Sequence, residues 1–265
     1  PAVKVIERGE LRQDVWDLIF ANIRLSIVQE DMRAEIGACT VGERRLLALP
    51  DKYGLERFEL HKLHLFGAAR RMMEAAIRTI PPGTYRGEST VYYDGKTPGS
   101  TYRIRVAITD LDGRIRFDYS ATDPQTNGFV NGTYTSSASA TILTFLQMVN
   151  PDIPHNHGMT EPIEIVIPEG TLLNAAYPAA TTFGNHLCPP NADAIIRALA
   201  PVIPGRVTAG WNQLLCSLST GHHPRRDAYV DILFMGLKGG SGAMESCDGY
   251  DHIGMIDASG GVLDQ

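Results

Sequence analysis

YRIRVAITDLDGRIRFDY, residues 102–119, is the stretch that decides the fold. Apolar and polar residues alternate along it on both sides of Asp112-Gly113. A period of two is typical of a strand with one buried face, and a short Asp-Gly turn between two such runs is typical of an antiparallel hairpin. Arg103 and Arg105 are then expected on the polar face. The opposite face is predicted to hold Tyr102, Ile104, Val106, Ile108, Ile115, Phe117 and Tyr119.

The residues that follow and precede the hairpin predict an α+β fold. We expect residues 83–265 to form a domain built on a mainly antiparallel, mixed sheet with packed helices. The helix over 133–149 begins with small residues, which favours close packing of that face. Asn191 is a residue type that caps helix N-termini. Strands are expected at 84–94, 163–167 and 229–237, and helices at 133–149 and 192–200.

The first part of the chain, residues 1–82, is predicted to be a helical segment. Apolar residues recur at helical spacing before residue 30, and a second helix is expected at 41–52, with Gly54 as its C-terminal cap. A third helix at 55–79 ends before Pro81-Pro82, where the backbone cannot continue a helix. The apolar stripe of the first helix consists of Leu11, Val15, Leu18, Ile19, Ile23 and Ile27, and the buried residues expected in the third are Met72, Met73, Ala76 and Ile77.

Composition argues against several classes of partner. The net charge is −6 with acidic and basic residues mixed along the chain, whereas nucleic-acid binding requires a basic stripe. No polybasic segment would hold a membrane surface, and no apolar run approaches the roughly 20 residues of a membrane span. The four cysteines show no C-x-x-C spacing, which predicts free buried thiols. We therefore expect a cytoplasmic protein whose start, Pro1 without a preceding Met, indicates a trimmed chain.

Polar clusters in predicted loops are the candidates for chemistry. Asp123 precedes a proline, so it either caps a turn or contributes a carboxylate to a site. Gly184, Asn185 and His186 could form a pocket wall or only a structural turn, because glycine permits close approach and the other two supply donors. His155 and His157 could face one cation, but solvated loop histidines are the alternative and no third ligand follows them. Asp248 and His252 follow the glycine-rich run 239–243, which could bind phosphate or a metal, or be simply a loop.

These motifs, taken in order, resemble the hydantoinase B family. The family comprises the large partner subunits of N-methylhydantoinases, 5-oxoprolinases, and acetone and acetophenone carboxylases. Members are considerably longer, so the chain resembles their central portion. The residues that carry the resemblance are ERGELR at 7–12, GERRLL at 42–47, YGL at 53–55, PGTY at 82–85, TDPQ at 122–125, NPDIP at 150–154, Asn156, Gly158, PIE at 162–164, PEGTLLN at 168–174, Gly184-Asn185 and Asp248-Gly249.

The resemblance implies a subunit or fragment of an ATP-dependent, multi-subunit enzyme. A hydantoinase-A-type subunit would bind ATP with Mg²⁺ and phosphorylate a carbonyl oxygen of a small-molecule substrate. The remaining parts of the same large subunit would complete a hetero-oligomer. A divalent transition metal such as Zn or Mn would be held in the N-terminal part of the family pattern, so no metal ligand is assigned to this sequence.

Three readings of the function follow from the resemblance. We lean to carboxylation of a ketone such as acetone or acetophenone, because His186 and residues 248–252 look less like the hydantoinases. The alternatives are hydrolysis of a cyclic amide, as in N-methylhydantoinase or 5-oxoprolinase, and a non-catalytic scaffold that docks the ATP-using subunit. The predicted catalytic residues are Asn185, His186 and Asp123, and the predicted substrate-binding residues are Gly184, Asp248 and His252.

Overall fold

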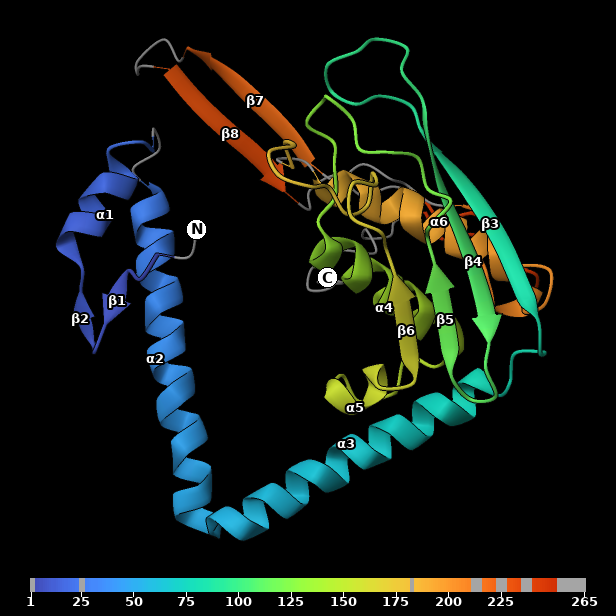
Figure 1. Ribbon diagram of the computed structural model, residues 1–265, viewed down its shortest axis with the longest axis horizontal. Helices are drawn as coiled ribbons and strands as arrows, with labels where there is room; N and C mark the ends of the chain where they lie inside the picture. The colour runs from blue at the N-terminus through green and yellow to red at the C-terminus, as the bar shows by residue number, and fades with distance from the viewer. Residues whose placement is uncertain are drawn as a thin grey trace. The chain divides into compact units, whose positions relative to one another are not determined.

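The computed structural model of the chain describes residues 3–23, 27–181, 184–210, 216–222, 228–234 and 240–251. Contacts between Cα atoms divide the chain into two compact units, Pro1–His64 and Leu65–Gln265. Figure 1 shows the order of the helices and strands in both units.

The first unit begins with a small hairpin rather than a helix. β1 (Ile6–Glu7) and β2 (Glu10–Leu11) pair antiparallel. The two residues between them, Arg8 and Gly9, have φ angles of 53° and 85°, which is the left-handed pair that a tight hairpin turn requires. The prediction of a wholly helical start is therefore wrong for residues 6–11.

Two helices complete this unit, and their bounds differ from those predicted. α1 (Gln13–Phe20) is short and buries Trp16, whose ring centroid lies 4.6 Å from that of Phe20. Leu18, expected to face inward, is 68% exposed. α2 (Ile27–Tyr53) starts well before residue 41 and ends, as predicted, at Gly54, whose φ is 84°.

α3 (Leu55–Ile77) continues from the first unit into the second, where its last turns reach the core. Met73, Ala76 and Ile77 are buried as predicted, whereas Met72 is 37% exposed. The helix ends ahead of Pro81-Pro82 as expected. Its C-terminal half therefore belongs to the packing of the sheet domain.

A four-stranded sheet forms the centre of the second unit. Its strands are β3 (Thr84–Val91), β4 (Tyr102–Asp110), β5 (Ile115–Asp118) and β6 (Ile163–Val166), in that order across the sheet. β3 and β5 flank β4 antiparallel, and β6 is parallel to β5. The predicted hairpin is confirmed, since Ile104, Ile108 and Phe117 are fully buried.

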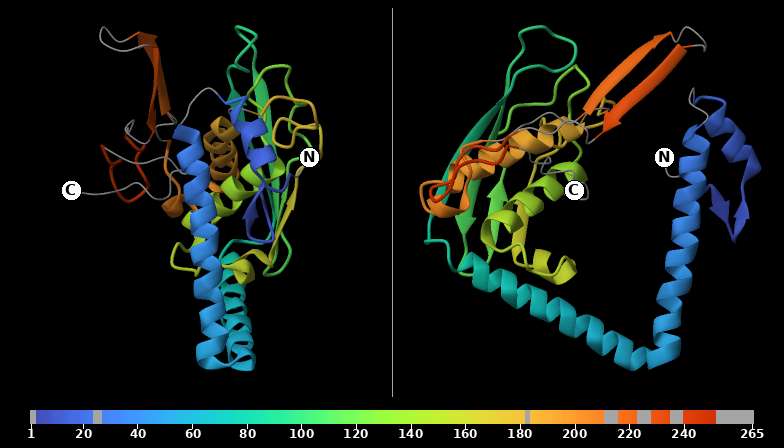
Figure 2. Two further views of the ribbon diagram at one scale, coloured as in Figure 1. Left: turned by 90° about the vertical axis from the view of Figure 1, so that its left-hand side faces the viewer. Right: turned by 180° about the vertical axis from the view of Figure 1, so that it is seen from behind.

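Helices cover one face of the sheet. α4 (Tyr134–Val149) and α6 (Cys188–Leu199) pack against each other, and α6 also lies along β3 and β4, as the view from behind in Figure 2 shows. Phe145 of α4 contacts Phe117 edge-to-face at 5.3 Å. The remaining elements are α5 (His157–Thr160), η1 (Gly184–Leu187), η2 (Pro204–Arg206) and a separate antiparallel pair, β7 (Cys216–His222) with β8 (Ala228–Phe234).

This architecture confirms the predicted α+β class, with long N-terminal helices followed by a mixed sheet and packed helices. The start of α6 was also predicted wrongly. α6 begins at Cys188, with prolines in its first turn, so Asn191 lies inside the helix and is fully buried. Proline is tolerated in a first turn because its missing N–H would have no helical partner there. The predicted strand at 229–237 is observed as β8, and residues 235–237 lie outside the described residues.

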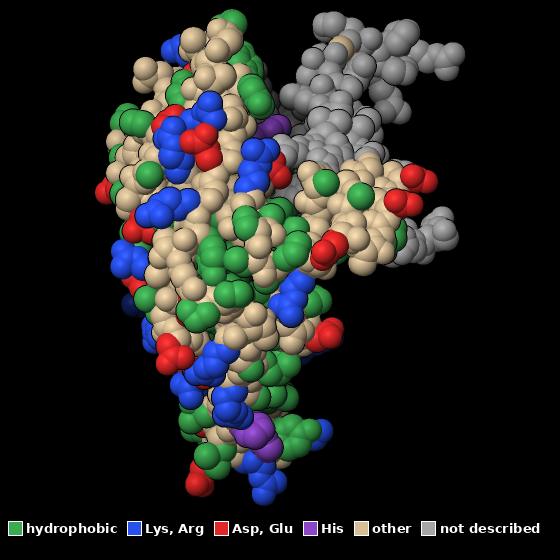
Figure 3. All heavy atoms as spheres, turned by 90° about the vertical axis from the view of Figure 1, so that its right-hand side faces the viewer, with side chains coloured by type: hydrophobic (Ala, Val, Ile, Leu, Met, Phe, Trp, Pro, Cys, Tyr) green, Lys and Arg blue, Asp and Glu red, His purple; other side chains and the backbone are tan. Residues whose placement is uncertain are grey.

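The other face of the sheet is polar. Arg103 and Arg105 lie on it as predicted, together with Arg86 and Glu88 of β3. Charged side chains of both signs are interspersed over the face of the molecule in Figure 3. Among the described residues, no helix combines the length and the apolar content that a membrane span needs.

The loop between β3 and β4 is built around a buried carboxylate. Asp94 is 1% exposed, and its Oδ1 accepts hydrogen bonds from the backbone N–H groups of Lys96 (2.8 Å) and Thr97 (2.6 Å). The Tyr102 hydroxyl donates to Oδ2 at 3.0 Å. These bonds, the Thr97 N–H first, lower the pKa of Asp94 from 3.8 to about 2.

We predict that Gly87→Ala destabilises the protein. A Cβ at Gly87 would lie 1.9 Å from the carbonyl oxygen of Ala194, so α6 would have to move away from β3. We expect a loss of about 1–3 kcal/mol in the free energy of unfolding, the usual cost of overpacking, measured by urea denaturation. Gly37→Ala in α2, where no atom lies within 4 Å, is the control and should stabilise by about 0.5–1 kcal/mol. Equal stability of Gly87→Ala and the wild type would contradict the close contact.

We also predict a pH-dependent effect of Asp94→Asn. A carboxylate whose pKa is lowered by folding contributes stability that is complete above its ordinary pKa of 3.8 and is lost as the pH falls toward about 2. The variant should therefore be less stable than the wild type at neutral pH, and the difference should shrink below pH about 4. Urea denaturation across this pH range measures it. Asp112→Asn, in the exposed hairpin turn, should show no such narrowing.

Candidate functional site

Three loops far apart in the sequence meet where β3 and β5 end. They are residues 92–101, 119–133 and 167–181, and they lie together at the upper end of the sheet in Figure 1. The backbone N–H of Phe129 donates to the carbonyl of Asp94 at 3.0 Å, which joins the first two loops. The N–H of Gly132 donates to the carbonyl of Leu172 at 2.8 Å, which joins the second and third. We call the place where these three loops and the ends of β3 and β5 meet the junction.

Asn131 holds this junction together and is fully buried. Its Nδ2 donates to the carbonyl of Ala180 at 2.9 Å, and its Oδ1 accepts from the N–H of Thr126 at 2.7 Å. Gly184 packs directly against it, since a Cβ there would lie 2.5 Å from the Asn131 carbonyl oxygen. Close contact with the protein's own backbone therefore explains a glycine at 184, and its role in substrate binding stays a prediction.

The N-termini of α4 and α6 lie side by side behind the junction. The Sγ of Cys188, at the start of α6, is 3.7 Å from the Oγ of Ser136 in the first turn of α4. Thr133 caps α4, and its side chain accepts from the Ser136 N–H. Paired helix N-termini place two positive dipole ends together, which favours an anion at this place.

The backbone donors at this place come mainly from α4. Two prolines, Pro189 and Pro190, remove N–H groups from the first turn of α6. Tyr134 and Thr135 begin α4 and are exposed, and no described residue accepts a hydrogen bond from their backbone N–H groups. Such free N–H groups are the donors that bind phosphate or carboxylate at helix N-termini.

A buried polar network joins the two helices to the hairpin. The Nδ2 of Asn191 donates to the Ser137 carbonyl and to the Oγ1 of Thr141, both at 3.1 Å. The Tyr119 hydroxyl lies 2.8 Å from the same Oγ1, and burial raises the pKa of Tyr119. The Oδ1 of Asn191 is buried without a hydrogen-bond partner among the described residues. The network fixes where both helices start.

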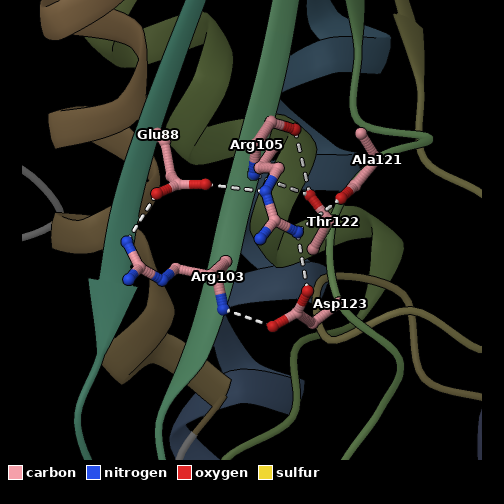
Figure 4. Close-up of polar contacts among 6 residues, drawn as sticks. All are labelled: Glu88, Arg103, Arg105, Ala121, Thr122 and Asp123. Atoms are coloured by element: carbon pink, nitrogen blue, oxygen red, sulfur yellow. Dashed lines mark hydrogen bonds and ion pairs between the residues drawn. The ribbon is translucent and has the colours of Figure 1, made fainter.

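Asp123 connects the loop 119–133 to the sheet through hydrogen bonds with β4. Its carboxylate accepts from the Arg103 N–H and from Nη1 of Arg105, both at 2.7 Å. Arg105 also donates through Nε to Glu88 at 2.7 Å and through Nη1 to the Ala121 carbonyl at 3.0 Å. Asp123 and Glu88 raise the pKa of Arg105. Figure 4 shows how these groups bridge β3, β4 and the loop. A catalytic role of Asp123 stays a prediction.

The structure brings together only some of the predicted site residues. Gly184, Asn185 and His186 lie in η1, next to the start of α6, and the His186 side chain is exposed. Asp248 lies in the described segment 240–251, part of which packs near the C-terminal end of α6, where Arg197 and Glu245 line a pocket. A helix of this length separates its two ends by about 18 Å. His252 lies outside the described residues.

The histidine and cysteine candidates have mainly structural surroundings. Asn156 caps α5, and its Oδ1 accepts from the N–H of Gly158 at 2.9 Å. The ring of His157 lies edge-on to Phe66 at 6.0 Å. Of the cysteines described as free thiols, Cys188 is buried as predicted, whereas Cys39 and Cys247 are exposed. Within the described ranges, no three His, Cys, Asp or Glu side chains are placed to hold a metal ion.

The sequence analysis missed Asn131 and Ser136 as parts of this site. The small residues of 136–140 indicated close packing but not its partner, which is α6. No sequence pattern linked Asn131 to residue 180. The arrangement can bind an anionic group beside the helix N-termini and hold it with backbone donors.

Known proteins resemble this chain along nearly its whole length. The caprolactamase beta subunit of Pseudomonas jessenii is 32% identical over 273 residues, covering 99% of this chain and 46% of that protein. The B subunit of a putative D-/L-hydantoinase of Pseudomonas sp. (strain NS671) is 31% identical over 270 residues, covering 97% of this chain and 45% of that protein. The chain thus spans a little under half the length of these curated relatives.

Two solved structures share the fold. The crystal structure of ATP-dependent caprolactamase from Pseudomonas jessenii matches with a TM-score of 0.84 at 30% identity, over 97% of this chain and 45% of that one. The nucleotide-free structure of acetone carboxylase matches with a TM-score of 0.85 over all of this chain and 37% of that one. At 20% identity the second likeness shows the fold alone. Since the family model described as Hydantoinase B/oxoprolinase also matches residues 1–263, this chain belongs to the hydantoinase B/oxoprolinase family.

Proposed function

We propose that the chain is part of the B-type subunit of an ATP-dependent enzyme that hydrolyses a cyclic amide. The observation that carries the proposal is the likeness to caprolactamase, at 30% identity and a TM-score of 0.84 along 97% of the chain. The second relative is named as part of a hydantoinase, and hydantoins are also cyclic amides.

The expectation of ketone carboxylation is less well supported than this alternative. The relatives above 30% identity are named for a lactam and for hydantoins, whereas acetone carboxylase resembles the chain at 20% identity. The features that favoured carboxylation were His186 and residues 248–252. His186 is exposed in η1, and His252 lies outside the described residues.

The proposed chemistry overcomes amide resonance by phosphorylation. The γ-phosphoryl group of ATP passes to the carbonyl oxygen of the ring, and water adds to the activated carbon. The C–N bond then breaks as the nitrogen takes a proton, which leaves an acyl phosphate. A second water hydrolyses this acyl phosphate, and the products are an open-chain amino acid, ADP and phosphate. Preorganised donors would stabilise the negative charge that develops on oxygen.

A partner and a metal complete the proposal. The names of the relatives designate beta and B subunits, which supports assembly with an A-type subunit that binds ATP and Mg²⁺. The free N–H groups of Tyr134 and Thr135, beside the start of α6, support binding of an anionic phosphate by this chain. A divalent metal such as Zn or Mn would be held by other parts of the large subunit.

Reconstitution of the complex tests the reaction. We expect the chain, assembled with an A-type subunit together with the rest of its large subunit, to open a lactam, a hydantoin or 5-oxoproline with equimolar release of ADP. Coupled ADP detection and mass spectrometry of the ring-opened product measure this. A carboxylated product from bicarbonate and a ketone would support the alternative reaction. Full turnover without this chain would instead indicate a scaffold.

Substitution of Asn185 and His186 tests their proposed role as donors. Alanine at both positions should lower kcat by about 10²–10³-fold, the usual cost of losing donors to a developing oxyanion. Assembly of the complex, checked by size-exclusion chromatography, should be unchanged. His155→Ala, an exposed loop histidine before α5, is the control and should keep full activity. Unchanged kcat in the double variant would remove both residues from the site.

A further inference from the structure

The polar face of the sheet contains a hollow of about 480 Å³ on the side opposite α4 and α6. Its walls include Arg86 and Glu88 of β3, Arg105 of β4 and Asp118 of β5. Ala107 and Ala121 are among its apolar lining residues, together with Val106. A volume of this size lies within the range of small-molecule sites.

Strand register explains why the hollow exists. Arg86 pairs with Ala107, and Ala107 pairs with Asp118. Directly paired residues project from the same face of a sheet, so a cation, a methyl group and an anion stand in one row across three strands. Neighbouring strands are about 4.8 Å apart, which places the backbones of Arg86 and Asp118 about 10 Å from each other.

The charges of the hollow are not equally available to a ligand. Glu88 binds Arg103 and Arg105, and Arg105 also binds Asp123. No described residue forms a hydrogen bond or an ion pair with the exposed side chain of Arg86. The guanidinium of Arg86 therefore has all its donors free.

Asp118, at the other end of the row, has acceptor capacity left. Its Oδ1 accepts from the Ser120 N–H at 2.9 Å, and its Oδ2 is 3.4 Å from Nη2 of Arg116. The second distance is long for a charge-assisted bond, which is usually about 2.7–2.9 Å. A carboxylate accepts about four hydrogen bonds, so a further cation can bind here.

We propose that this hollow binds a linear amino acid whose carboxylate and ammonium groups are separated by several methylenes. The carboxylate lies against the guanidinium of Arg86, which suits bidentate binding. The ammonium group lies at Asp118, and the methylenes cover the methyl groups of Ala107 and Ala121.

Such a molecule is what opening of a lactam ring releases, because hydrolysis frees one amine and one carboxylate on a single chain. The assignment of the ligand as the reaction product rests on the proposed function. Binding of the amino acid is measured without ATP or turnover. Absence of binding would therefore not disprove the proposed reaction, and absence of the reaction would not disprove binding.

Isothermal titration calorimetry on the full 265-residue chain tests the proposal with aminocaproate, caproate and hexylamine. Aminocaproate should bind at least about tenfold more tightly than either singly charged analogue, a difference of about 1.4 kcal/mol. Arg86→Gln should reduce its affinity about tenfold, as expected for loss of a charge-assisted pair. No aminocaproate binding in the millimolar range, or equal affinity for all three probes, would overturn the proposal.

A matched pair of variants locates the site. Ala107→Leu fills the hollow without changing charge and should weaken aminocaproate binding about tenfold or more. Thr109→Leu changes the next position on the same face of β4, in the row with Thr84 and Arg116, and should leave binding intact. Thermal denaturation checks that both variants fold. If both leucines weaken binding equally, the hollow is not the site.

Discussion

The close contact between α6 and β3 is the constraint on which the second unit depends. At Gly87 the strand backbone meets the helix backbone, with room for no side chain between them. Near the start of the helix, Ser89 donates from Oγ to the carbonyl of Pro190 at 2.6 Å. A helix held at both places cannot slide along the sheet, so α6 must start beside α4. The loops that lead into the two helices then have to converge, and the junction around Asn131 is the consequence.

Prediction from sequence succeeded where the signal was local. The alternation over 102–119 identifies both strands and their buried face because each side chain's direction follows from its own position. The start of α6 was predicted wrongly because two local signals were ambiguous. Asn191 is a good capping residue, but its amide instead donates to Ser137 and Thr141 of α4. Proline ends some helices and begins others, and here Pro189 and Pro190 occupy the first turn.

The candidate site was accessible to sequence analysis only in pieces. The motif at 122–125 and the glycine at 184 were identified as loop features, and both lie at or beside the junction. Their partners could not be inferred, because Asn131 reaches Ala180 across 49 positions and no short-range pattern encodes such a contact. Asp248 is a different case: a glycine-rich setting predicted a site, and part of its segment packs near the C-terminal end of α6, so its role in substrate binding stays a prediction. Residue type indicates chemistry, whereas proximity depends on how the whole sheet domain packs.

One residue on the polar face of the sheet, Ala107, is not explained by the stability of the fold. Arg103, Arg105 and Thr109 follow the expected pattern for the solvent side of β4. Ala107 does not, because alanine has a low strand propensity and forms weak cross-strand pairs. A threonine or a long charged residue would stabilise the strand better and would fill the space between Arg86 and Asp118. Stability therefore gives no reason for a small residue at the centre of this row, whereas a hollow that must receive a ligand requires one.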